Sequence, residues 1–182
     1  MPQLSLSIQI ASQFANIPTN MQFKKWAKAA LRVDTEVTIR IVDEAEDQAL
    51  NLAYRSKDYA TNVLTFLLIE TPHLMGDIVI CAPIVSKEAS EQHKTLEAHY
   101  AHLTVHGMLH LSGFDHETQA QAELMEAIEI QILVKLGYAN PYLISEDAKS
   151  KLHGIRTRKT EQQNYYQNQF IRAFKQFFAT RA

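Results

Sequence analysis

The chain has 182 residues, of which 46% are hydrophobic and 21% are charged, and its formal net charge at pH 7 is −2. This length supports one domain with its own core, and this composition excludes a disordered, collagen-like or coiled-coil chain. A single cysteine, Cys81, excludes an intramolecular disulfide and fits a reducing compartment, so we expect a cytoplasmic protein. The N-terminus lacks the basic start of a secretion signal, and no stretch approaches the ~18 apolar residues of a membrane span.

The predicted elements, in chain order, are a strand over 4–10, a helix over 21–31, a strand over 36–42, a helix that starts in the acidic run 43–47 and continues through 54, strands over 62–69 and 77–81, and helices over 84–93, 96–111 and 116–136. We interpret the acidic run as a solvated helix start, where negative charge meets the positive end of the helix dipole. This order predicts an α+β fold with one small, mostly parallel mixed sheet of four strands packed with helices.

Charge is divided unevenly along the chain. Residues 149–182 hold eight basic residues and one acidic residue, a net charge of +7, which leaves ten basic and nineteen acidic residues, a net charge of −9, in residues 1–148. The near-neutral net charge of the whole chain is therefore the sum of two opposite regional charges, and it does not exclude an RNA ligand. We predict a folded domain over 1–148 and a basic, aromatic extension over 149–182. Contact of the extension with RNA, or packing of its aromatic stripe on the core or a partner, both remain open.

Three histidines follow the spacing of a metal site. His106 and His110 are four residues apart on a predicted helix, so they share one face and can bind one ion. Gly113 is expected to end the helix in a left-handed conformation, so that the chain turns back and brings His116 to the same ion. Three imidazoles leave one coordination position for water, as catalytic zinc requires. We therefore predict one zinc ion per chain, held by these three histidines.

The residue after the first histidine separates two chemistries. Zinc peptidases with this ligand spacing carry a glutamate there as general base, whereas this chain has Gly107. Since glycine weakens a helix by about 1 kcal/mol, we expect a substrate or a packing neighbour to approach the backbone closely at this position. The sequence therefore predicts the metal site without the peptidase mechanism.

Four further polar residues are candidates for a part in this chemistry. His99 and His102 continue the histidine face, where either could contact substrate or carry a proton, but we favour a supporting or surface role. Asp115 either orients a ligand or caps the following helix, and both interpretations remain open. Arg55 carries the guanidinium that a phosphate-cleaving zinc site needs opposite the metal, although a basic residue before a strand is often only solvated.

The segment from His106 to His116, HGMLHLSGFDH, resembles the signature of the YbeY family of endoribonucleases. Residues 54–58 (YRSKD) with 61–66 (TNVLTF), and 76–81 (GDIVIC), resemble two further family segments in the expected order. The resemblance covers about residues 4–143. The chain departs from the family pattern at two positions, with phenylalanine at 114 where tyrosine is usual and leucine at 67 where proline is usual.

This resemblance implies a single-strand-specific, metal-dependent endoribonuclease that acts in 16S rRNA 3′-end maturation, ribosome quality control and 30S assembly. It implies the same three zinc ligands, and it makes Arg55 the catalytic basic residue that stabilises the charged transition state during zinc-assisted attack on an RNA phosphodiester. The implied partners are single-stranded RNA and the ribosome, through its 30S subunit and 16S rRNA. A non-catalytic ribosome-assembly or RNA-binding factor with a structural zinc site is the alternative, and the effect of metal removal on folding separates the two.

Overall fold

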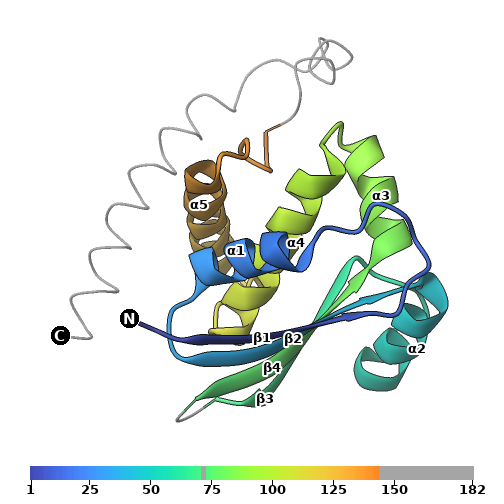
Figure 1. The fold of residues 1–182 in the computed structure, drawn as a ribbon, viewed down its shortest axis with the longest axis horizontal. Helices are drawn as coiled ribbons and strands as arrows, with labels where there is room; N and C mark the ends of the chain where they lie inside the picture. The colour runs from blue at the N-terminus through green and yellow to red at the C-terminus, as the bar shows by residue number, and fades with distance from the viewer. Residues whose placement is uncertain (71–72, 144–182) are drawn as a thin grey trace.

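The computed structural model describes residues 1–70 and 73–143, so the predicted extension over 149–182 lies outside the described residues. The elements follow in the order β1 (Leu4–Ile10), α1 (Asn20–Ala30), β2 (Thr35–Val42), α2 (Glu44–Arg55), β3 (Val63–Ile69), β4 (Leu74–Cys81), α3 (Ala82–Glu91), α4 (Leu96–Leu111) and α5 (Gln119–Leu136) (Figure 1). Within the described ranges, no helix combines the length and apolar character needed to cross a membrane.

The four strands form one sheet in the order β1-β2-β4-β3. Strand β2 pairs in parallel with β1 and with β4, whereas β3 runs antiparallel to β4. The registers align Ile8 with Ile39 and Ile39 with Ile78, which places apolar side chains of neighbouring strands on a common face. The predicted α+β fold with a mostly parallel mixed sheet of four strands is therefore confirmed.

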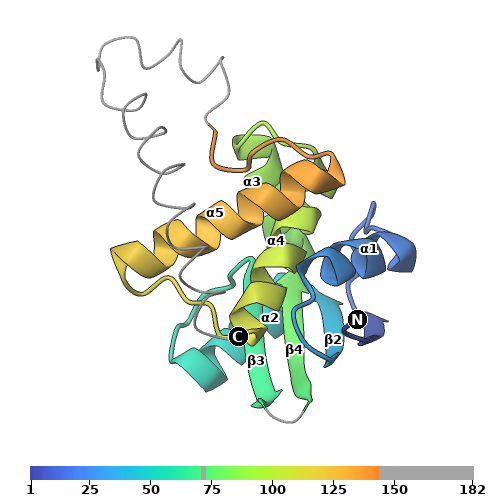
Figure 2. The same cartoon turned by 90° about the vertical axis from the view of Figure 1, so that its left-hand side faces the viewer.

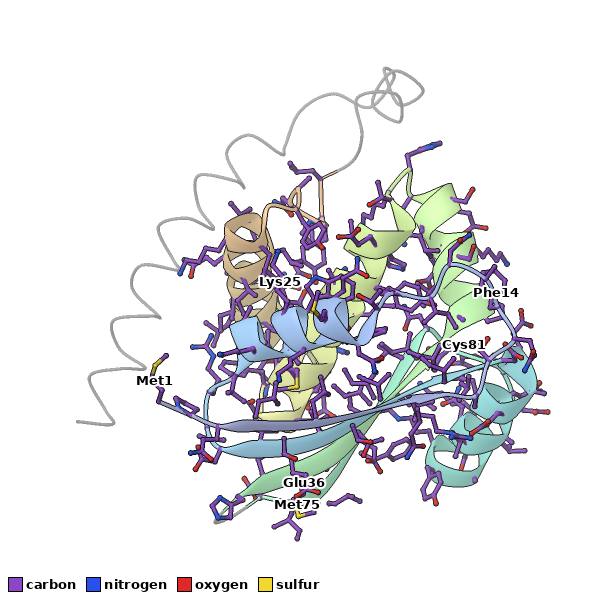
Figure 3. All side chains as sticks on the ribbon, viewed as in Figure 1. Met1, Phe14, Lys25, Glu36, Met75 and Cys81 are labelled. Atoms are coloured by element: carbon purple, nitrogen blue, oxygen red, sulfur yellow. The ribbon has the colours of Figure 1, made fainter. Side chains whose placement is uncertain are left out.

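Helices cover both faces of this sheet. Helices α1, α4 and α5 lie on one face (Figure 1), where their buried side chains join those of the strands in the main core. A smaller cluster on the other face combines Val42, Leu64, Val79 and Cys81 with Leu50 of α2. The thiol of Cys81, at the end of β4 (Figure 3), is free and buried. By their places in the strand order, β1 and β3 are the edges of the sheet.

Helix α4 is central to the main core and is buried on most of its surface. Tyr100 of α4 packs edge-to-face on Phe23 of α1, with ring centroids 5.9 Å apart. Trp26 of α1 is fully buried and donates a hydrogen bond from Nε1 to the hydroxyl of Tyr138, at 3.0 Å, just after α5. The first contact joins α1 to α4, which carries the first two predicted metal ligands, and the second joins α1 to the segment after α5.

Gly107 marks a close approach of α4 to the sheet. A Cβ atom at this position would lie 2.9 Å from both Cδ1 and Cγ2 of Ile78 in β4, which is closer than packed carbon atoms allow. The sequence predicted that either a substrate or a packing neighbour approaches this backbone, and the structure shows a packing neighbour, Ile78. Because position 107 faces the sheet, a glutamate in the place of Gly107 would collide with Ile78, and this chain has no room there for the peptidase base.

Several predicted boundaries are wrong: α3 spans Ala82–Glu91 instead of 84–93, and two other differences have a clear structural cause. Helix α5 begins at Gln119 and not at residue 116, because Thr118 is its N-cap and exchanges hydrogen bonds with Gln121 in a capping box. Asp115 therefore does not cap this helix. Strand β4 begins at Leu74 rather than at residue 77, so Gly76 lies inside the strand, where a Cβ atom would meet Cδ2 of Leu111 at 2.5 Å.

The interpretation of the acidic run 43–47 as a solvated helix start is wrong for Asp47. Its side chain is fully buried, and Oδ1 accepts a hydrogen bond from the backbone N–H of Thr61 at 2.6 Å. Burial raises the pKa of this carboxyl, and the hydrogen bond from Thr61 opposes that rise. Asp43 precedes the helix as its N-cap residue, and its Oδ2 accepts from the backbone N–H of Gln13 at 3.4 Å. These acids therefore hold neighbouring loops in place.

Candidate metal centre

The structure brings the three predicted histidines together at the end of α4. His106 and His110 lie one turn apart on this helix, with their Nε2 atoms 3.0 Å from each other. The ring of His116 stacks on that of His106, with centroids 5.6 Å apart, and lies 4.9 Å from the ring of His110. One ring nitrogen from each histidine falls within 4.8 Å of the others, so the three could hold a single ion.

The turn after α4 explains how His116 reaches the helix. Gly113 has φ +85°, and its N–H donates to the carbonyl of His110 at 3.0 Å, while the N–H of Phe114 donates to the carbonyl of Leu109 at 3.1 Å. This pair of bonds is a Schellman motif, which ends helices at a left-handed residue and favours glycine. Asp115 accepts the backbone N–H of His116 at 2.7 Å. The turn predicted from Gly113 is therefore confirmed.

A buried glutamate supports the cluster from α5. The carboxylate of Glu129 is fully buried and accepts hydrogen bonds from Nδ1 of His106 at 2.6 Å, from Nε2 of His102 at 2.9 Å and from the hydroxyl of Tyr142. Burial alone would raise the pKa of Glu129, but the hydrogen bonds from His102 and His106 outweigh it and lower the pKa to about 2. Glu129 is thus an ionised acceptor for both histidines.

The donor set fits a metal ion such as zinc. Burial, followed by the neighbouring His106 and His116, lowers the pKa of His110 to about 4, so this imidazole is neutral at pH 7 and has a lone pair to offer. Because Glu129 accepts from Nδ1 of His106, the proton of that ring lies on Nδ1 and Nε2 is free to bind an ion. Three imidazole nitrogens are a donor set that zinc uses.

A second group in the described chain, formed by His102, His106 and Glu129, also has ligand atoms within 4.8 Å of one another. The hydrogen bonds between Glu129 and the two histidines account for this closeness. His106, His110 and His116 are therefore the group that could hold an ion, and Glu129 is a positioning residue for His106.

His102 has the supporting position that the sequence favoured, whereas His99 is buried against Glu88. His102 shares Glu129 with His106, as described above. His99 is only 3% exposed, and its Nε2 lies 2.7 Å from Oε2 of Glu88 on α3. Sequence analysis missed Glu129, whose only signal is a charged side chain among the buried apolar residues of α5.

Arg55 is the last residue of α2, and its side chain is exposed. Across residues 1–70 and 73–143, the guanidinium of Arg55 forms no hydrogen bond or ion pair with the three histidines or with any other residue. The loop that follows is anchored by α2: Asp47 accepts from the N–H of Thr61, and Nδ2 of Asn51 donates to the carbonyl of Tyr59 at 2.7 Å. The guanidinium of Arg55 is exposed at the end of α2 and is available to a ligand.

Comparison with known proteins identifies relatives over most of the described chain. Residues 7–137 match the family described as Endoribonuclease YbeY. The chain is 61% identical over 142 residues to Endoribonuclease YbeY of Methylobacillus flagellatus, covering 78% of this chain and 95% of the relative. It is 55% identical over 143 residues to the protein of the same name from Aromatoleum aromaticum, covering 77% and 93%. The solution structure of TM1509 from Thermotoga maritima is 27% identical, covers 72% of this chain and 91% of that one, and superimposes with a TM-score of 0.49.

Proposed function

Because this chain belongs to the endoribonuclease YbeY family, we propose that it is a single-strand-specific, metal-dependent endoribonuclease that acts in 16S rRNA 3′-end maturation, ribosome quality control and 30S assembly. The proposed partners are single-stranded RNA and the ribosome, in the cytoplasm. The observation that carries the proposal is the cluster of His106, His110 and His116 with their ring nitrogens within 4.8 Å of one another. The relatives are named as endoribonucleases, so the proposed reaction is hydrolysis of an RNA phosphodiester.

We assign one zinc ion per chain to these three histidines. Bound zinc would supply a Lewis acid that polarises a phosphodiester oxygen and makes water a stronger acid near neutral pH. The neutral state of His110 at pH 7 supports the assignment, because a protonated ring cannot bind an ion. Glu129 supports it further by keeping the proton of His106 on Nδ1.

The chain's own residues then have separate roles in orienting the proposed ligands and in stabilising charge. Glu129 holds the rings of His106 and His102 in fixed orientations through two hydrogen bonds. We assign Arg55 to the stabilisation of the negative charge that develops on the phosphoryl oxygens, because its exposed fork can bind two of them. The net charge of +7 in residues 149–182 supports a role for that extension in phosphate binding.

The His110→Ala variant tests the proposal directly. We expect it to lose both bound zinc and at least ~100-fold of the cleavage rate on a labelled single-stranded RNA. His73→Ala is the matched control, since the His73 side chain is 69% exposed and lies outside the cluster, and it should keep both properties. A His110→Ala protein that lacks zinc and still cuts RNA at the wild-type rate would overturn the proposal.

A further inference from the structure

A cavity of about 320 Å³ opens beside the metal centre. It lies between α3, α4, the residue before β3 and the segment that follows α5, which Figure 2 shows next to α3 and α4. His106 lines this cavity and also belongs to the histidine cluster. The volume is at the lower end of the range for small-ligand pockets, roughly 300 Å³ and above. A substrate bound at the histidines therefore has, next to it, space for one further small group.

The polar wall of the cavity is built around a carboxylate. Glu88 accepts hydrogen bonds from Nδ2 of Asn62, at 3.0 and 3.2 Å, and from Nε2 of His99 at 2.7 Å. Burial opposes its ionisation, but the hydrogen bonds from His99 and Asn62 outweigh burial, so the pKa of Glu88 lies below its usual value. Its side chain is still 27% exposed, and Oε1, which among the described residues accepts only the bond from Asn62, can accept another hydrogen bond, whereas Oε2 already accepts two.

The chemistry of the remaining walls narrows the choice of ligand. Val63, Leu103, Pro141 and the Tyr142 ring give the cavity apolar sides, which suit a flat ring. The carboxylate of Glu88 repels a phosphate and requires a ligand that donates hydrogen bonds. Lys94, whose Nζ donates to Oε1 of Gln92 at 2.6 Å, adds a donor at the same cavity. Proteins bind unpaired nucleobases through this combination of flat contacts and edge hydrogen bonds.

We propose that the cavity binds one unpaired nucleobase of the RNA beside the cleavage site, and that Glu88 selects bases that carry an amino group. This inference rests on the proposed function, which makes RNA the substrate. The amino N–H groups of guanine, cytosine and adenine can donate to the Glu88 carboxylate. Uracil has no amino group, and the carbonyl oxygens on either side of its single N–H would face the carboxylate. The cavity therefore disfavours uracil.

Nucleoside binding tests the cavity without any need for cleavage. Guanosine, cytidine and uridine are titrated into the full chain, and the NMR signals of the Asn62 amide and the His99 ring report on occupancy. We expect guanosine and cytidine to bind at least ~5-fold more tightly than uridine and to shift these signals. Glu88→Gln should reduce this preference to less than ~2-fold, whereas Glu91→Gln, an exposed residue of the same helix, should keep it. Equal affinity for the three nucleosides, or shifts confined to other regions, would overturn the inference.

Cleavage rates then test whether the cavity takes part in the reaction. Zinc-loaded protein is given single-stranded RNAs that differ only in the base at one position, and each position along the strand is varied in turn. We expect one position where uracil lowers kcat/KM by about tenfold, which corresponds to 1.4 kcal/mol. If kcat/KM is the same for all bases at every position, and Glu88→Gln has the same kcat/KM as the wild type, the role of the cavity is overturned. The nuclease function is then unaffected. Failure to cleave any RNA would overturn the function instead, and the nucleoside titration would still decide the cavity.

Discussion

Glu129 accepts the Nδ1 proton of His106 at 2.6 Å through a carboxylate that is fully buried. Because that proton stays on Nδ1, Nε2 of the same ring is left to bind an ion. The carboxylate also accepts from His102 at 2.9 Å, so the two rings are fixed together. A residue of α5, 23 positions after His106 in the sequence, thus sets the orientation of the first proposed ligand.

We expect Glu129→Gln to weaken zinc binding by about 10- to 100-fold. A glutamine amide has one accepting oxygen and one donating nitrogen, so it cannot accept from both His102 and His106. The zinc Kd is measured by competition with a chromophoric chelator. Glu91→Gln, an exposed acid on α3 outside the cluster, is the control and should keep the wild-type Kd. An unchanged Kd in Glu129→Gln would refute the positioning role.

Gly107→Ala should destabilise the protein by about 1–2 kcal/mol in chemical unfolding, although alanine is the better helix former. The reason is steric, since the added Cβ lies 2.9 Å from Ile78, which is fully buried. The effect is measured as the change in free energy of unfolding. A double-mutant cycle supplies the control: in an Ile78→Ala background the collision is removed, and Gly107→Ala should no longer destabilise. The same loss in both backgrounds would contradict this explanation.

Much of the framework could be predicted from local patterns. Strand β1 (Leu4–Ile10) alternates apolar and polar side chains, and α4 (Leu96–Leu111) is bounded by a capping threonine and by Gly113, so both were predicted with the observed ends. The spacing from His106 to His116 was sufficient to predict that the three proposed metal ligands meet, because one helix turn and one glycine turn bring them together. These are properties of short segments.

The errors come from contacts between distant segments. The predicted strand over 77–81 excluded Gly76, yet the missing side chain of Gly76 makes room for Leu111 of α4 within the strand. Asp47 looked solvated because its burial depends on the loop that reaches it at Thr61, 14 residues later. Glu129 carries no local sign of its role, since its partners lie on another helix. Only the folded chain shows these relationships.

Removal of the metal should leave the protein folded. The main core is formed by apolar side chains of α1, α4, α5 and the sheet, whereas His106, His110 and His116 keep part of their surface exposed. We expect chelator-treated protein to keep its circular dichroism spectrum and its cooperative unfolding, with a Tm lower by several degrees because bound zinc stabilises the folded state. Unfolding on chelation would instead favour the alternative of an assembly factor with a structural zinc site.

Arg55→Ala should lower the rate of RNA cleavage by about 100-fold, because charge stabilisation in the transition state is lost. Zinc content and the free energy of unfolding should stay unchanged, since the side chain is exposed and unpaired among the described residues. Lys25→Ala, an exposed cation on α1 (Figure 3), is the control for a general loss of positive charge. Cleavage by Arg55→Ala at the wild-type rate would show that this arginine has no part in the reaction.

Zinc titration of chelator-treated protein tests the central claim most directly. The cleavage rate of a labelled single-stranded RNA is followed as zinc is added in steps, with bound metal measured on the same samples. Occupation of the cluster of His106, His110 and His116 predicts a rate that rises in proportion to bound zinc and saturates at about one ion per chain. Metal-free protein that already cleaves RNA at the full rate, with no change on addition of zinc, would contradict the account.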